Sequence, residues 1–152
     1  MAKLSPFKLV GFFIFIVQIS VGILYSYLVC NFVFKITNSR VTTFFFLLTF
    51  TSLYAGNAYL WDIVGYGDFF AYFFLFLSIS NRNVFWIFLT LTLAFWIDER
   101  AVVNASFVYC WWVIKDNNEN LDDKLFNFKY FSTTFLAVLG YLLMRVALTS
   151  YF

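Results

Sequence analysis

The residues of this 152-residue chain that could do chemistry are charged side chains set among apolar runs. Asp98, Glu99 and Arg100 form a triplet between two apolar runs, and Arg145 is the only charge well inside the last run. Carboxylates beside an arginine inside a membrane can form a proton relay, and ionisable groups there are functional candidates by default. The favoured interpretation of the triplet is a helix leaving lipid, with a buried ionic contact or a contact to a neighbouring subunit. For Arg145 we favour a contact with a lipid headgroup.

A second candidate is the glycine-bearing segment Val64, Gly65, Tyr66, Gly67 and Asp68. It resembles the selectivity filter of potassium channels, where backbone carbonyls replace the water shell of the ion and glycines permit the required backbone angles. The resemblance implies an ion pathway through these five residues. The chain departs from the family pattern, because Ile63 stands where that family usually has threonine and the run 69–80 is too short for an inner helix. A glycine-bearing connection at a membrane surface is therefore the favoured interpretation.

The composition excludes most soluble and catalytic classes. Hydrophobic residues make up 63% of the chain and charged residues 12%, and the 24 phenylalanines exceed what a small globule can bury. The absence of histidine excludes His-ligated haem, His metal sites and imidazole-based triads. Cys30 and Cys110 lack metal-like spacing and are interpreted as reduced packing residues. We therefore predict no catalytic residues, no metal and no cofactor, and a net charge of +2 offers no basic surface for nucleic acid.

The apolar runs lack strand-like alternation, so they predict membrane helices rather than barrel strands. The expected fold is all-α, a polytopic integral membrane protein with a single transmembrane domain over 1–152. The run 7–34 is far longer than a signal-peptide core and predicts a retained transmembrane helix. The expected spans are 7–34, 41–61, 63–80, 84–114 and 130–149, with a polar loop at 115–129.

The number of spans depends on the stretch 84–114. As one tilted helix it gives five transmembrane helices, and broken at 98–100 it gives six. We favour one helix, because two 14-residue pieces would each reach only about 21 Å of a hydrocarbon core about 30 Å thick. Small residues spaced four apart, such as Gly22 with Ser26 and Ser52 with Gly56, could allow close helix contact, although such pairs are common in a chain of this composition.

The abundance of Phe and Tyr, the apolar character of the whole chain and the lack of a catalytic set together suggest a function class. In overall character the chain resembles the organelle-encoded, phenylalanine-rich membrane proteins of protist mitochondria, such as those of ciliates. That resemblance implies a non-catalytic accessory subunit of a respiratory-chain complex or ATP synthase in the mitochondrial inner membrane. Its expected partners are other membrane subunits and phospholipids such as cardiolipin. The alternatives are a potassium-channel-like pore and a proton-conducting core subunit.

Overall fold

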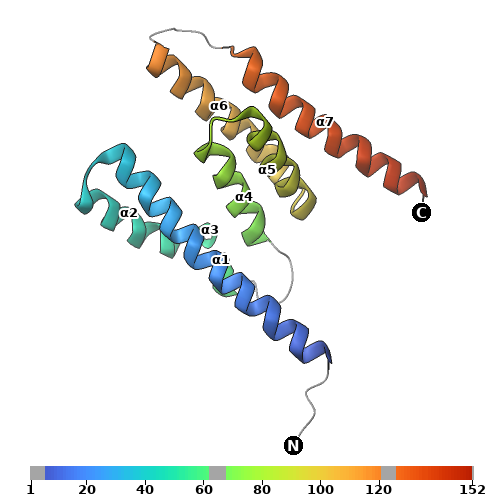
Figure 1. Ribbon diagram of the computed structural model, residues 1–152, viewed down its shortest axis with the longest axis horizontal. Helices are drawn as coiled ribbons and strands as arrows, with labels where there is room; N and C mark the ends of the chain where they lie inside the picture. The colour runs from blue at the N-terminus through green and yellow to red at the C-terminus, as the bar shows by residue number, and fades with distance from the viewer. Residues whose placement is uncertain (1–5, 62–67, 121–125, 152) are drawn as a thin grey trace, which may run out of the picture. The chain divides into compact units, whose positions relative to one another are not determined.

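The computed structural model describes residues 6–61, 68–120 and 126–151, and every regular element in these ranges is an α-helix (Figure 1). This confirms the predicted all-α class for the described residues. The helices are α1 (Pro6–Thr37), α2 (Arg40–Ser52), α3 (Tyr54–Trp61), α4 (Asp68–Ser80), α5 (Val84–Ile97), α6 (Ala101–Asn120) and α7 (Phe128–Tyr151). The chain divides into two compact units, residues 1–69 and 70–152, which are described separately.

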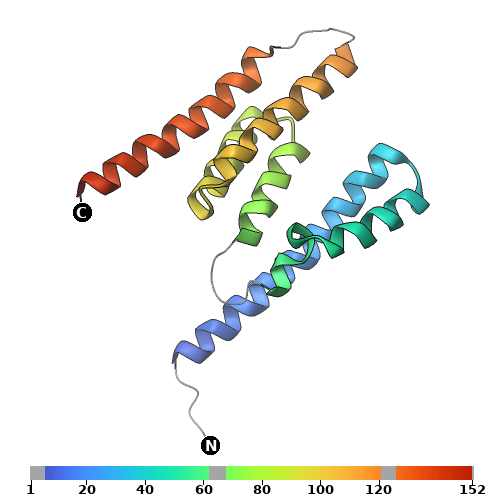
Figure 2. The ribbon, with the colours of Figure 1, turned by 180° about the vertical axis from the view of Figure 1, so that it is seen from behind.

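The first unit begins with a helical hairpin. Asn38 adopts a left-handed backbone with φ of 47°, a conformation that asparagine tolerates well. Ser39 then caps α2, because its hydroxyl accepts a hydrogen bond from the backbone N–H of Thr42 at 3.3 Å. As a result α2 runs back along α1, as both ribbon views show (Figures 1 and 2).

The helix expected at 41–61 is interrupted at Leu53, so its prediction as one span is wrong. Leu53 is extended, with φ of −87° and ψ of 149°, and it separates α2 from α3. The hydroxyls of Thr51 and Ser52 donate to the carbonyl of Leu48 at 3.0 and 2.9 Å, and the Leu53 N–H donates to the Phe50 carbonyl at 3.1 Å, which tightens the last turn of α2. Gly56 allows the turn to close tightly, because a Cβ there would lie 1.9 Å from the Phe50 carbonyl oxygen.

Contacts of α1 with α3 add to those that α2 makes with both helices in the first unit. A Cβ on Gly22 would lie 2.3 Å from the ring of Tyr59, which confirms the predicted close helix contact at Gly22. The buried Gln18 donates from Nε2 to the main-chain carbonyl of Tyr59 at 3.0 Å. That carbonyl lies in the last turn of α3, where main-chain acceptors lack intrahelical donors. Gln18 therefore satisfies a group that would be costly to leave unpaired in an apolar setting.

The second unit is a bundle of short helices around alanine-rich contacts. Buried side chains recur every three or four residues on each helix, as expected for one packed face. On α5, α6 and α7 they include Ile87, Leu91, Ala94, Phe95, Ala101, Ala105, Val108, Trp112, Tyr130, Ala137 and Tyr141. Three half-buried residues of α4, Phe74, Leu75 and Ile79, pack against this core. The alanines let the helix axes approach closely, which larger residues at those positions would prevent.

The stretch 84–114 is two helices, so the favoured prediction of one long helix is wrong. Asp98 is extended, with φ of −141° and ψ of 117°, and its carboxylate accepts from the backbone N–H of Arg100 at 3.0 Å. This local turn reverses the chain, and α6 returns along α5 (Figure 2). Helix α6 continues to Asn120, so residues 115–120 of the expected polar loop are helical.

Two helices in the described ranges are long and apolar enough to cross a membrane, Val10–Thr37 and Phe128–Tyr151. The expected five spans, or six, are therefore not supported. The physical reason is length, because the apolar helices α4 and α5 have 13 and 14 residues and reach only about 20 Å.

Candidate functional site

Ionic and polar contacts gather at two opposite ends of the second unit. One end lies where α5 begins, α6 finishes and α7 begins, and the other lies where α5 finishes and α6 begins. Helix α5 has 14 residues, so the two ends are about 21 Å apart. The group around Arg82 and Asp116 is here named the first cluster, and the group around Glu99 and Arg145 the second cluster.

The first cluster joins three segments that are distant in sequence. Arg82, in the turn before α5, forms an ion pair with Asp116 of α6. Its Nε also donates to the hydroxyl of Tyr130 on α7 at 3.3 Å. Asn127 donates from Nδ2 to the other carboxylate oxygen of Asp116 at 2.7 Å. The carboxylate of Asp116 thus holds the start of α7 and the α4–α5 turn on the same end of α6.

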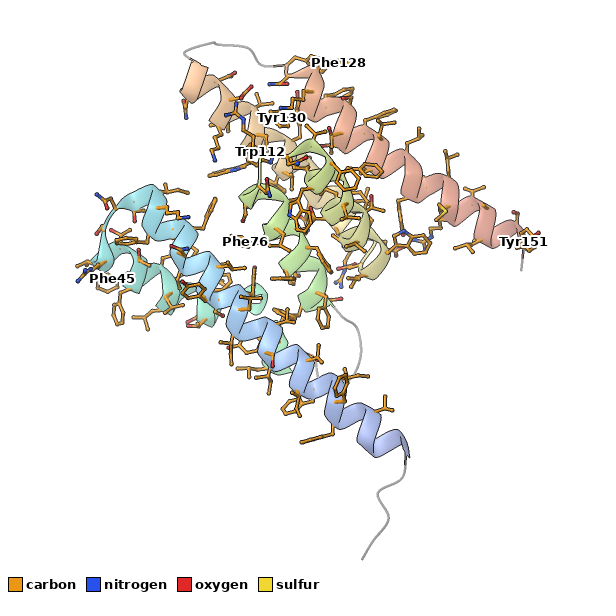
Figure 3. The ribbon with its side chains drawn as sticks, viewed as in Figure 1. Phe45, Phe76, Trp112, Phe128, Tyr130 and Tyr151 are labelled. Atoms are coloured by element: carbon orange, nitrogen blue, oxygen red, sulfur yellow. The ribbon has the colours of Figure 1, made fainter. Side chains whose placement is uncertain are left out.

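Two aromatic rings lie beside this ion pair. Trp112 is 1% exposed and stacks on Tyr130 with ring centroids 5.6 Å apart and planes 19° apart, and Figure 3 shows the two labelled side chains together. The indole Nε1 donates to the carbonyl oxygen of Ser78 at 3.0 Å, which ties α6 to α4. The ammonium groups of Lys115 and Lys129 lie 5.0 and 5.2 Å from the Trp112 and Tyr130 ring centroids, within cation–π range.

The second cluster contains all four charged residues singled out from the sequence in the triplet and in α7. Asp98 accepts from the Nε of Arg100 with both carboxylate oxygens, at 3.0 and 3.1 Å. Glu99 forms an ion pair with Arg145, although 46 residues separate them. Arg145 also donates to the hydroxyl of Tyr141 at 2.7 Å. Each carboxylate of this cluster thus faces an arginine of the same chain.

Exposure places the second cluster on the surface of the chain. The side chains of Glu99, Arg100 and Arg145 are 62%, 69% and 53% exposed, whereas Asp98 is 11% exposed. The Arg145 guanidinium reaches back to Tyr141, one turn toward the start of its helix, as helical side chains generally do. Asp98 and Glu99 thus pair with arginines of the same chain, while Glu99, Arg100 and Arg145 are open to the surroundings. The buried or inter-subunit contact expected at 98–100 stays a prediction. Arg145 contacts Glu99, and the lipid-headgroup contact expected for it stays a prediction.

Sequence reasoning missed Arg82, Trp112, Asp116 and Tyr130. Their individual types carry no motif, and only helix packing brings them together. Residues 64–67 of the candidate ion pathway lie outside the described residues, and Asp68 is the buried first residue of α4. Within 6–61, 68–120 and 126–151, no three His, Cys, Asp or Glu side chains gather as metal ligands would.

Comparison of the chain with protein-family models, with curated proteins and with solved structures gives no match. Both cysteines are free thiols, with Cys30 half-buried and Cys110 exposed. The two clusters connect helices of the second unit. Their chemistry is that of ionic and aromatic contacts between helices.

Proposed function

We propose that this chain is a membrane-embedded, non-catalytic subunit that helps to hold a larger assembly together. The observation that carries the proposal is the exposure of large apolar side chains around whole helices. On α1, Phe12, Phe13 and Ile14 are 64%, 66% and 54% exposed. Successive residues of a helix point about 100° apart, so these three face widely different directions. A helix that is apolar on every side needs lipid or other subunits around it.

Helix α7 supports the same proposal. Tyr130, Thr133, Ala137 and Tyr141 are its buried residues, and they form a single stripe. The remaining faces expose further large apolar residues, including Phe131, Phe135, Leu136, Leu139, Leu142 and Leu143. The length and composition of α1 and α7 suit membrane crossing. Exposed apolar surface on this scale marks an interaction with membrane or partner.

We place the assembly in the mitochondrial inner membrane, as part of a respiratory-chain complex or ATP synthase. The support is the phenylalanine-rich composition, with 24 Phe and 10 Tyr among 152 residues, which resembles that of organelle-encoded subunits. The polar contacts support a structural role, because they tie helices of the same chain to one another. Expected partners are other membrane subunits and phospholipids such as cardiolipin.

The experiment combines fractionation with surface variants. The chain should remain in carbonate-washed inner mitochondrial membranes, and its appearance in the soluble fraction would contradict the proposal.

In the surface variants, pairs of exposed rings, Phe12 with Phe13 and Phe44 with Phe45, are replaced by alanine, as is Phe107. At least one set should release the chain from its assembly while its helical circular dichroism stays unchanged. The matched control, Phe95→Ala, removes a ring that is 1% exposed and should instead lower the free energy of unfolding of the chain. Retention of all surface variants in the assembly would argue against the proposal.

The second cluster favours one other function, a proton-conducting core subunit. Arg145 donates to both Glu99 and the hydroxyl of Tyr141, so a carboxylate that could carry a proton lies beside a fixed positive charge. Glu99→Gln distinguishes the two functions. Loss of turnover of the host complex with assembly intact would support proton conduction. Loss of assembly, or no effect on turnover, would support the structural role.

A further inference from the structure

Charged residues recur at a regular spacing along the helices of the second unit. Residues 69–81, 83–97, 101–114 and 130–144 carry no charged side chain, and each of these segments is bounded by charges. They contain 13 to 15 residues, so as helices they span about 20 to 22 Å. The same apolar length therefore occurs four times in succession.

The packing brings the ends of these segments together. The first cluster unites Arg82, Asp116 and the start of α7 at one end. The second cluster unites the α5–α6 turn with Arg145 of α7 at the other end. The bundle is thus an apolar layer about 20 Å thick between two charged faces.

This layer is thinner than the hydrocarbon core of an ordinary bilayer, which is about 30 Å. If the first cluster lay at one surface of such a bilayer, the second would lie about 10 Å inside the hydrocarbon. More than half of the side chains of Glu99, Arg100 and Arg145 would then be exposed to lipid tails, an expensive arrangement for charged groups. Helix α7 is long enough to cross an unthinned bilayer, but only with this cluster in hydrocarbon.

We propose that the bundle of α4, α5, α6 and α7 thins the lipid bilayer around it, so that both clusters meet water and lipid headgroups. The inference rests on the membrane location given under the proposed function. A bilayer can thin around a short apolar segment at modest cost per ångström. By contrast, α1 carries no charge between Lys8 and Lys35, about 39 Å of helix, and accommodates an ordinary bilayer by tilting. The two units therefore suit membranes of different thickness.

The first test measures water access to the second cluster in dioleoylphosphatidylcholine nanodiscs, where both membrane faces are open to reagents. In a Cys30→Ser, Cys110→Ser background, Arg100→Cys is compared with Val103→Cys, whose native side chain is 71% exposed but lies inside an apolar segment. A membrane-impermeant maleimide should label position 100 at least about tenfold faster than position 103, because the reactive thiolate forms in water. Equal, slow labelling would overturn the thinning proposal. Glu99→Cys replaces Arg100→Cys if that variant fails to fold.

The second test measures lipid preference through quenching of tryptophan fluorescence by brominated phosphatidylcholines. Dimyristoleoyl, dioleoyl and dierucoyl chains are compared in competition with unbrominated dioleoyl lipid. Relative affinity should be greatest for the shortest chains, and a preference for dierucoyl lipid or no preference would overturn thinning. A protein that does not enter nanodiscs at all would instead overturn the membrane location, and with it the proposed function.

Discussion

Replacement of Trp112 by phenylalanine tests the packing of the second unit. The substitution removes the bond from the indole Nε1 to Ser78 and reduces the stacking on Tyr130. A hydrogen bond between membrane helices contributes about 0.6 kcal/mol on average and about 1.7 at most. An aromatic pair adds about 0.5 to 1.5 kcal/mol, of which phenylalanine keeps a part. Under the proposed membrane location the separated helices stay in lipid, so no large hydrophobic transfer is added. Trp112→Phe should therefore lower the free energy of unfolding by about 1 to 2 kcal/mol.

The measurement is unfolding by sodium dodecyl sulfate in mixed micelles, followed by circular dichroism. The matched control is Trp86→Phe, which changes the same side chain at a site on α5 that is 38% exposed. Its effect should stay within about 0.5 kcal/mol. If Trp112→Phe destabilises the protein no more than Trp86→Phe does, the reasoning about this contact is refuted.

Three further predictions concern the remaining contacts. Gly56→Ala should destabilise the first unit by at least about 1 kcal/mol in the same unfolding assay, because its Cβ meets main-chain atoms. Gln18→Leu should cost about 0.6 to 1.7 kcal/mol, because it leaves a main-chain carbonyl of α3 without its donor. In a double-mutant cycle, Glu99→Gln and Arg145→Leu should be coupled but only weakly, because both side chains are more than half exposed.

Each of these three predictions has an outcome that would contradict it. Gly140→Ala is the control for Gly56, because no atom lies within 4 Å of its Cβ, and it should be neutral or stabilising by up to about 1 kcal/mol. Equal effects at the two glycines would refute the close approach. If Gln18→Leu leaves the free energy of unfolding unchanged, the main-chain carbonyl of Tyr59 must find another donor. Strong coupling in the cycle would place the ion pair in hydrocarbon, against the thinning proposal.

The helical class could be predicted because a long apolar run without strand-like alternation has few ways other than a helix to pair its backbone N–H and C=O groups. The points where the helices are interrupted were harder to predict from the sequence. At 98–100 the charged triplet interrupts the apolar sequence, but span length favours one helix, whereas in the structure a local bond from the Arg100 N–H to Asp98 turns the chain. At Leu53 no residue type marks the break, because Thr51 and Ser52 bond back within α2 just as Thr49 does in its interior.

The clusters were only partly predictable. Asp98, Glu99, Arg100 and Arg145 stood out because charges are rare in apolar sequence. The pairing of Glu99 with Arg145 depends on the register of α7 against the α5–α6 hairpin, which the alanines of all three helices help to set. No local pattern encodes that register.

The most direct measurement of the proposed role is native gel electrophoresis after extraction in mild detergent, with mass spectrometry of what comigrates. The chain should be found entirely within a large assembly, together with membrane subunits of a respiratory-chain complex or ATP synthase. If the chain leaves its native membranes as a stable, isolated monomer in that detergent, with none of it in an assembly, the proposal that its apolar faces bind neighbouring subunits is contradicted.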